Sequence, residues 1–527
     1  MARDIDAIRT GHPSFILLYS PLQFSPEEMA KPDGSLSLPY VAGALRRAGY
    51  PVSILDCSVG GDNDSLEETF FHPTVMANGL LRVGLSRERI VQLVADYDVV
   101  GISSIFTTQS SMVLDTVRTI KQAYPEKLMI AGGVNARNLR DRFFAAGVDV
   151  ICLSEAEITV VQIADAIRGK CRLSSIPGIA FLDPSGKEVV NRPGPVLQDL
   201  DELPIPAWDL LPLDKYWTIS RPHGGQFPEG KRIQYASVQT SRGCPFQCLY
   251  CHISKEEVDG ISGSIGAFRV KSVDRVMQEL YTLKSLGAEY IFFEDDSLFA
   301  KKKRAYTLFK MVRNLGLHLV DVNGVNICHL QKNYNGTLGV DTEFLEVLAE
   351  GGFSFVHLPF ESANQRLLDR YSTGKWTIAK TDTRRLIEAC NQVGIGTAGN
   401  YMIGYPDETR QEIFNTMLMA KRHVEQGLNH AALFAVVPFP GTLLFDTVIA
   451  NGQLDQNFNT DQMKWTRSIL KGLSIPADTL EEMRQLAWLT VNRSEFVDYK
   501  IAMRVSIPEA KMPPLTRPAE TTRLAIL

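Results

Sequence analysis

The sequence predicts an α/β protein in which a doubly wound, Rossmann-like domain precedes a partial (β/α)6 barrel. Short apolar runs alternate with helical patterns over residues 1–170, and six similar runs alternate with helices over 233–444. A linker rich in Pro and Gly separates the two series at 171–232. Such alternation is typical of parallel sheets covered by helices. Residues 445–527 are expected to form a small helical region that ends in a mobile tail.

The composition indicates a globular enzyme of a reducing compartment. The chain has 527 residues, of which 45% are hydrophobic, and a net charge of −5. It has no basic surplus that would neutralise the phosphates of a nucleic acid. The N-terminus lacks the apolar core of a signal peptide, and no uncharged run approaches the length of a membrane span. We therefore expect a cytoplasmic enzyme with neither nucleic acid nor a membrane as partner.

The first domain is expected to contain five parallel strands. Apolar runs predict these strands at 15–19, 52–56, 98–103, 128–133 and 148–152, with helices near 39–48 and 110–123. Ligands of such sheets bind at the carboxyl ends of the strands. Small and polar residues occupy these ends, namely Ser103, Ser104, Gly132, Gly133, Ser154 and Glu155.

The second series predicts six strands and five intervening helices. The expected strands are 234–240, 290–294, 319–324, 353–360, 396–403 and 431–437. The helices fall near 272–286, 302–315, 342–350, 377–393 and 408–426. The linker before them is expected to pack against both domains. Functional groups of such barrels gather where the strands end.

Three cysteines follow directly after the first strand of the barrel. Cys244, Cys248 and Cys251 lie on one short loop. Three thiolates can hold three irons of a [4Fe–4S] cluster and leave the fourth iron without a protein ligand. An open iron can bind a substrate or cosubstrate, so this spacing favours catalysis over simple electron transfer.

Other interpretations of this loop are weaker. Cys248 to His252 also spells Cys-x-x-Cys-His, the pattern of haem c attachment, which requires export and leaves Cys244 unexplained. Zinc usually takes four protein ligands, and His252 would be the fourth, but adjacent Cys and His rarely bind one metal. Disulfides are disfavoured because the remaining cysteines are scattered.

The pattern Cys-x3-Cys-x-aromatic-Cys, with Tyr250 as the aromatic residue, resembles the signature of the radical S-adenosylmethionine (radical SAM) family. The resemblance implies that the free iron chelates SAM, and that one electron then cleaves SAM to a 5′-deoxyadenosyl radical. It also implies an electron donor such as flavodoxin or ferredoxin as partner.

Three later strand ends are similar to SAM-binding motifs of that family. They are the acidic run after the second strand, the Glu-Ser-Ala after the fourth and the segment 399–409 of the fifth. The SAM contacts implied are Tyr250, Glu294, Asp295, Glu361, Ser362, Tyr401 and Ile403. The acidic run is alternatively a solvated loop or helix cap, and Ser362 alternatively caps the next helix. The sequence assigns a catalytic role to no individual side chain.

The first domain resembles the cobalamin-binding domain fused to many radical SAM enzymes. The resemblance rests on the motifs at 39–45, 101–104, 131–134 and 154–157. It implies that cobalamin contacts Ser103, Ser104, Gly132, Gly133, Val134, Ser154 and Glu155. No histidine lies between residues 15 and 38, so cobalamin is expected base-off, without a protein histidine ligand. The alternative is a domain that kept the fold and lost the cofactor.

The resemblance as a whole implies a cobalamin-dependent radical SAM methyltransferase. Its expected reaction is methylation of an unactivated carbon in a small-molecule substrate such as a natural-product precursor. One alternative is a cyclase, ring-rearranging or dehydrating enzyme of the same architecture without net methyl transfer. Another is a non-catalytic iron–sulfur binding or sensing module. A methylthiolating RNA enzyme is disfavoured, because Cys57, Cys152 and Cys171 are too dispersed for a second cysteine trio.

Overall fold

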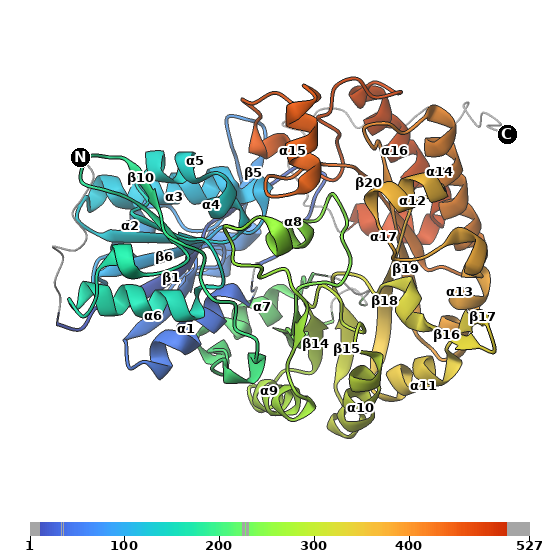
Figure 1. Cartoon of the computed structure of the whole chain (residues 1–527), viewed down its shortest axis with the longest axis horizontal. Coiled ribbons are helices and arrows are strands. Elements are labelled where there is room, and N and C mark those ends of the chain that lie inside the picture. The colour runs from blue at the N-terminus through green and yellow to red at the C-terminus, as the bar shows by residue number, and fades with distance from the viewer. Residues whose placement is uncertain (1–10, 33, 35, 224–226, 228–230, 503–527) are drawn as a thin grey trace.

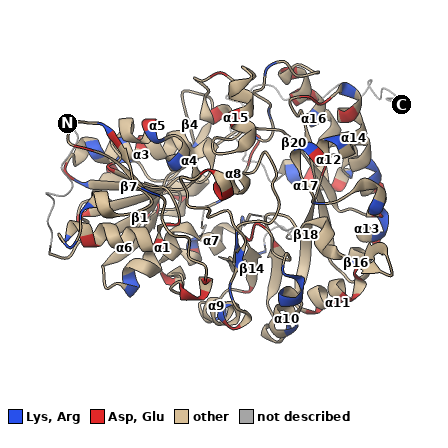
Figure 2. Ribbon diagram, in the orientation of Figure 1, with Lys and Arg blue, Asp and Glu red and all other residues tan. Residues whose placement is uncertain are grey.

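The computed structural model describes residues 11–502, apart from 33, 35, 224–226 and 228–230. Two sheets, each flanked by helices, lie side by side, and the short helix α8 (His252–Val258) lies between them (Figure 1). The predicted α/β fold class is confirmed. Charged residues concentrate on the outer helices, as Figure 2 shows around α9 (Val273–Ser285), α10 (Lys302–Val312) and α13 (Thr383–Gln392).

The first sheet contains the five predicted strands in parallel, and each lies within two residues of its expected bounds. They are β1 (Phe15–Tyr19), β3 (Val52–Asp56), β6 (Val99–Ser103), β7 (Leu128–Gly132) and β8 (Val150–Cys152). The helices are α1 (Ser37–Arg47), α2 (Arg87–Val94), α3 (Ser110–Ala123), α4 (Val134–Asn138), α5 (Arg140–Ala146) and α6 (Ala156–Ile167).

Helices cover both faces of this sheet. Successive residues of a strand point to opposite faces, so Leu17 of β1 packs into one hydrophobic cluster and Leu18 into the other. The order β3-β1-β6-β7-β8 reverses direction between β1 and β6. Ligands of open α/β sheets bind at such a reversal.

The segment expected as a linker contributes elements that the sequence pattern did not predict. Strands β9 (Ile179–Leu182) and β10 (Glu188–Val190) extend the first sheet in antiparallel fashion beyond β8. β10 is a mostly exposed edge strand, so no apolar run marks it. Helix α7 (Leu213–Ile219) follows.

A small separate sheet in the first half of the chain joins β2 (Leu22–Phe24), β5 (Leu81–Val83) and β4 (Thr74–Val75).

The second sheet has six parallel strands in chain order. They are β11 (Tyr235–Val238), β14 (Tyr290–Phe293), β15 (His318–Asp321), β18 (Phe353–Glu361), β19 (Gly396–Ile403) and β20 (His430–Ala435). In the part of the chain that is described, β11 and β20 do not pair with each other, so the sheet is a partial barrel.

Helices and short strands complete this half. The helices are α9 (Val273–Ser285), α10 (Lys302–Val312), α11 (Thr342–Glu350), α12 (Gln365–Tyr371), α13 (Thr383–Gln392), α14 (Arg410–Glu425), α15 (Leu443–Ala450), α16 (Ala477–Val491) and α17 (Ser494–Ala502). Two minor pairs are β12 (Ser241–Arg242) with β13 (Arg269–Val270), and β16 (Gln331–Tyr334) with β17 (Thr337–Val340). Among the described residues, no helix combines the length and apolarity needed to cross a bilayer.

The turn between β19 and α14 buries a carboxyl group. Oε2 of Glu408 accepts hydrogen bonds from the backbone amides of Gly404 (2.6 Å) and Tyr405 (3.1 Å). Oε1 has no hydrogen-bond partner among the described residues, and the residue is 2% exposed. Burial raises the pKa of Glu408 to about 8. Glu412, one helical turn further, is the opposite case, because hydrogen bonds from Arg366 lower its pKa to about 2.

We expect Glu408 to make the protein less stable as the pH rises. An unfolded Glu titrates near pH ~4.3, so from there to about pH 8 the folded chain holds a proton that the unfolded chain has released. Stability therefore falls across this window and stays low above it. Glu408→Gln, which cannot ionise, should gain in melting temperature relative to the parent between pH 5 and pH 9. Glu412→Gln is the control, and its difference from the parent should be constant over that range. A constant difference for Glu408→Gln would contradict the assignment.

Candidate functional site

A cavity of about 300 Å³ lies where the strands of the first sheet end. Six of the predicted cobalamin contacts line it, namely Ser103, Gly132, Gly133, Val134, Ser154 and Glu155. Its opposite wall comes from the second half of the chain and includes Arg242, Gly243, His252, Ile253 and Asp296. The cavity is therefore shared between the strand ends of the first sheet and the cysteine loop of the second.

Small residues form the floor of this cavity. Gly133 has a φ of 96°, and a Cβ there would lie 2.4 Å from the carbonyl oxygen of Ser104, so only glycine fits. Ser104 itself lies behind the wall, and its buried hydroxyl has no hydrogen-bond partner among the described residues. A cradle of small residues at the sheet reversal suits a flat cofactor such as the expected cobalamin.

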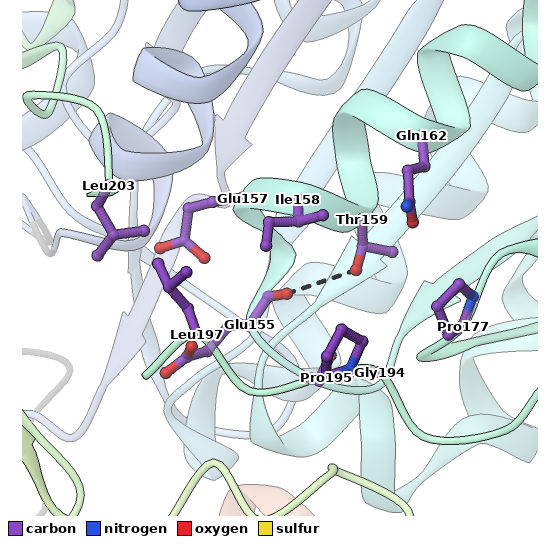
Figure 3. A pocket seen from close by; sticks show the side chains of 11 residues that line it. Glu155, Glu157, Ile158, Thr159, Gln162, Pro177, Gly194, Pro195, Leu197 and Leu203 are labelled. Carbon is purple, nitrogen blue, oxygen red and sulfur yellow. Dashed lines mark hydrogen bonds between the residues drawn. The ribbon is translucent and has the colours of Figure 1, made fainter. Parts of the chain in front are cut away.

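A second, much smaller cavity of about 40 Å³ lies beside the first turn of α6 (Figure 3). Its walls include Glu155, Glu157 and Thr159, and the Thr159 hydroxyl donates to the carbonyl oxygen of Glu155 at 3.5 Å. This volume suits a water molecule better than a cofactor. Ser154, Glu155 and Glu157 line both cavities, so the two spaces adjoin each other.

Asp295 fixes the start of the cysteine loop. Its carboxylate accepts from the Thr240 amide (3.0 Å), the Thr240 hydroxyl (2.8 Å) and the Ser241 hydroxyl. Gly243 follows with a φ of 74°, and a Cβ there would lie 2.3 Å from the carbonyl oxygen of Gly266. The sequence predicted that Asp295 contacts SAM, but its side chain is 1% exposed and engaged with this loop. Its visible role is to position the loop.

The cysteine trio is shielded from water. Cys248 is buried, and Cys244 and Cys251 are half-buried. Burial raises the pKa of all three thiols, to about 11 for Cys244 and about 12 for Cys251. The free thiols are therefore protonated near pH 7, and a metal must displace these protons to bind thiolates.

The chemistry of the trio suits an iron–sulfur cluster. Within the described ranges, no three His, Cys, Asp or Glu side chains are grouped closely enough to hold one metal ion. A [4Fe–4S] cluster takes one thiolate on each liganded iron. The donor set of three thiols on one loop suits that cluster.

Glu361, the last residue of the fourth barrel strand β18, lies close to the cysteine trio. Glu361 is buried, and it has a φ of 60°, a left-handed conformation that is strained for any residue other than Gly. Its carboxylate pairs with Lys375 at 2.9 Å. Although burial opposes it, Cys248 when it is a thiolate and the ionised Glu361 raise the pKa of Lys375, which therefore stays cationic beside the cysteines. Strain and buried charge together mark a functional position.

The other predicted SAM contacts lie in different environments. The Tyr250 hydroxyl is 2.8 Å from that of Ser372, and the Tyr250 ring lies 6.4 Å from Tyr405. Glu294 is half-buried, and its carbonyl oxygen accepts from the Asn323 amide at 3.0 Å. The buried Ser362 hydroxyl accepts from the backbone and side-chain amides of Asn364. Asn364, and not Ser362, is the N-cap of α12, so the alternative that Ser362 caps this helix is wrong.

Tyr401 and Ile403 point their side chains away from the strand ends. The Tyr401 hydroxyl lies 2.7 Å from Nδ1 of His423 in α14, and Ile403 packs with Ile413 and Leu480. Met402, between them, packs on the other face beside Tyr250. Any contact of Tyr401 or Ile403 with a ligand would therefore come from the backbone.

Sequence reasoning missed two residues of the site, Asp296 and Lys375. Asp296 is half-buried and lines the larger cavity, and burial together with Asp295 raises its pKa to about 7. The alternation of side chains along an extended segment could have predicted Asp296. Neighbouring side chains point to opposite sides, so that Asp295 faces the start of the cysteine loop and Asp296 faces the cavity. Lys375 lies in an irregular segment after α12, where no local pattern predicts a contact with Cys248.

Asp295 and Asp296 should respond differently to the same substitution. Asp295→Asn places an amide against donors from Thr240 and Ser241, which should cost about 1–3 kcal/mol and lower the melting temperature. Asp296→Asn should raise the melting temperature at pH 8, where the parent carries a charge in a poorly solvated position, and change it less at pH 5. Thermal melts at both pH values measure this, and equal effects of the two variants would contradict these roles.

Comparisons with known proteins match both halves of the chain. A model of the radical SAM superfamily matches residues 238–420, and a model of the B12 binding domain matches residues 34–164. An uncharacterized methyltransferase, PH0819, of Pyrococcus horikoshii is 30% identical over 370 residues, which cover 68% of this chain and 71% of that protein.

Two further relatives carry specific names. A cytidylyl-2-hydroxyethylphosphonate methyltransferase of Streptomyces wedmorensis is 26% identical, over 82% of this chain and 81% of that protein. An anaerobic magnesium-protoporphyrin IX monomethyl ester cyclase of Rubrivivax gelatinosus is 24% identical, over 82% of this chain and 69% of that protein.

Solved structures agree with the fold. The radical SAM methyltransferase TsrM from Kitasatospora setae, with cobalamin and a [4Fe–4S] cluster bound, aligns with a TM-score of 0.60 at 15% identity, covering 84% of this chain and 75% of that one. The cobalamin-dependent radical enzyme OxsB, with aqua-cobalamin and SAM bound, gives 0.64 at 14% identity, covering 90% and 66%. At such identities the likeness establishes the architecture alone.

Proposed function

Because the chain belongs to the cobalamin-dependent radical SAM enzymes, we propose that it is a C-methyltransferase that methylates an unactivated carbon of a small molecule. One observation carries the proposal. The cavity at the strand ends of the first sheet is walled on its other side by Arg242, Gly243 and Asp296, the neighbours of the cysteine loop. A methyl donor and a radical source bound at these two places would face each other.

Each half of the chain would hold one cofactor. Cys244, Cys248 and Cys251 would ligate the cluster, and the loops around Gly132 and Gly133 would receive cobalamin. When bound, the cluster would supply the electron that cleaves SAM to a 5′-deoxyadenosyl radical, and cobalamin would supply the methyl group.

The side chains near the trio suit a zwitterionic cosubstrate. Glu294, Glu361 and Lys375 offer both charge signs, which match the ammonium and carboxylate of SAM. Lys375 would exchange part of its pairing with Glu361 for the carboxylate, because both groups lie beside Cys248. The half-buried walls of the junction would keep water from a reactive radical.

A small-molecule substrate is supported by the enclosed junction and by the named methyltransferase of Streptomyces wedmorensis. A cyclase of the same architecture is the second candidate, because the likeness to the Rubrivivax gelatinosus cyclase spans 82% of this chain.

The products separate these two candidates. Anaerobically reconstituted protein, given SAM, a low-potential reductant and a pool of small-molecule substrates, should form one S-adenosylhomocysteine and one 5′-deoxyadenosine per methylated product. Mass spectrometry with methyl-labelled SAM counts these species. Turnover that yields 5′-deoxyadenosine and an unmethylated product would reject methylation and favour the cyclase.

Two variants should separate the two cofactors. Cys244→Ala should lose most of its iron and its 5′-deoxyadenosine formation while hydroxocobalamin still binds. Gly133→Ala should lose hydroxocobalamin binding and keep its iron, because its Cβ would strain a left-handed residue against Ser104. Cys328→Ala, a half-buried cysteine outside the trio, is the control and should keep both. If Cys244→Ala lost hydroxocobalamin but kept its iron, the assignment of the cluster to the cysteines would be contradicted.

A further inference from the structure

A buried ion pair joins the two cofactor loops. Arg137 lies on α4, which begins at Val134 directly after Gly133, and Glu256 lies on α8, which begins directly after Cys251. Their side chains form a salt bridge and are only 5% and 8% exposed. Arg137 also donates to the carbonyl oxygen of Leu153 at 3.1 Å, at the end of the neighbouring strand β8. One guanidinium therefore connects two strand ends of the first sheet with the helix that follows the cysteines.

A second set of charges crosses the same junction. Glu157 pairs with Arg242 at 2.5 Å, and Glu155 pairs with Arg269 at 2.7 Å and with Arg242 at 3.3 Å. Arg242 also lies over the ring of Tyr40, 4.8 Å from its centroid. Although burial opposes it, Arg242 and Arg269 lower the pKa of Glu155, so this acid stays ionised.

The elements tied by these charges have little stability of their own. α4 has five residues and α8 has seven, and isolated helices of this length do not persist in water. Each borders a cofactor site, because Val134 lines the cavity and Cys251 is the N-cap of α8. A buried charge cannot be separated from its partner without a large penalty. A ligand that orders one element therefore orders the other.

We propose that the Arg137–Glu256 bridge couples the two sites, so that cobalamin in the cavity orders the cysteine loop and the assembled cluster strengthens cobalamin binding. The inference rests on the proposed function and deepens it. Coupling between two ligands is reciprocal, so cobalamin should strengthen cluster binding by the same factor by which the cluster strengthens cobalamin binding. Arg137 and Glu256 act here as positioning residues.

The test removes both charges of one bridge at once. Arg137→Met with Glu256→Gln leaves no lone buried charge. The matched control is Arg140→Met with Glu188→Gln, which removes a 2.5 Å ion pair inside the first half of the chain. In each protein, hydrogen exchange of residues 243–258 is measured without a cluster, before and after addition of hydroxocobalamin. The dissociation constant of hydroxocobalamin is then compared between cluster-free and reconstituted protein.

The parent and the control should show protection of 243–258 on addition of hydroxocobalamin, and binding at least about fivefold tighter after cluster reconstitution. The bridge variant should still bind hydroxocobalamin but lose the protection and most of the fivefold effect. Coupling retained in the bridge variant, or no protection in the parent despite binding, would overturn this inference alone. Failure of the parent to bind hydroxocobalamin would overturn the proposed function and the inference with it.

Discussion

The junction of the two sheets is organised by one electrostatic constraint: four charged side chains that have little contact with water are paired across it. Arg242 and Arg269 come from the barrel, and Glu155 and Glu157 come from the first half of the chain. Each of the four has its counterion in the other half. The two sheets are consequently held in one relative position, with their strand ends facing the same cavity.

The protonation of the three cysteines depends on how the cysteine loop is packed. The start of the loop is hydrogen-bonded to Asp295, and Gly243 packs against the backbone of Gly266, so the thiols lie in a poorly solvated space. Poor solvation favours the protonated thiols, whereas the nearby cation of Lys375 favours thiolates. The site thus discourages premature oxidation of free cysteines and still supports the charge of a bound cluster.

The sequence predicted the strands and the cysteine trio because both are local patterns. An apolar run such as Leu128–Gly132 predicts a buried strand, and the spacing of three cysteines needs no tertiary information. The direction in which side chains point was harder to predict from the sequence. Tyr401 and Ile403 belong to a motif of the right type, yet their side chains face α14 and α16. Lys375 approaches Cys248 only through tertiary packing, and the exposed strand β10 lacks the apolar pattern that predicts strands.

The barrel is open, since β11 and β20 remain unpaired with one another in the described chain. A closed barrel fixes strand number, tilt and shear together, and its interior volume with them. Here the segment carrying Asp461 and Lys464 borders β20 and meets Gln23 and Ser25 of the first half. Because this segment is not a strand of the sheet, changes in its length would alter the contact between the two halves without shifting the register of any barrel strand.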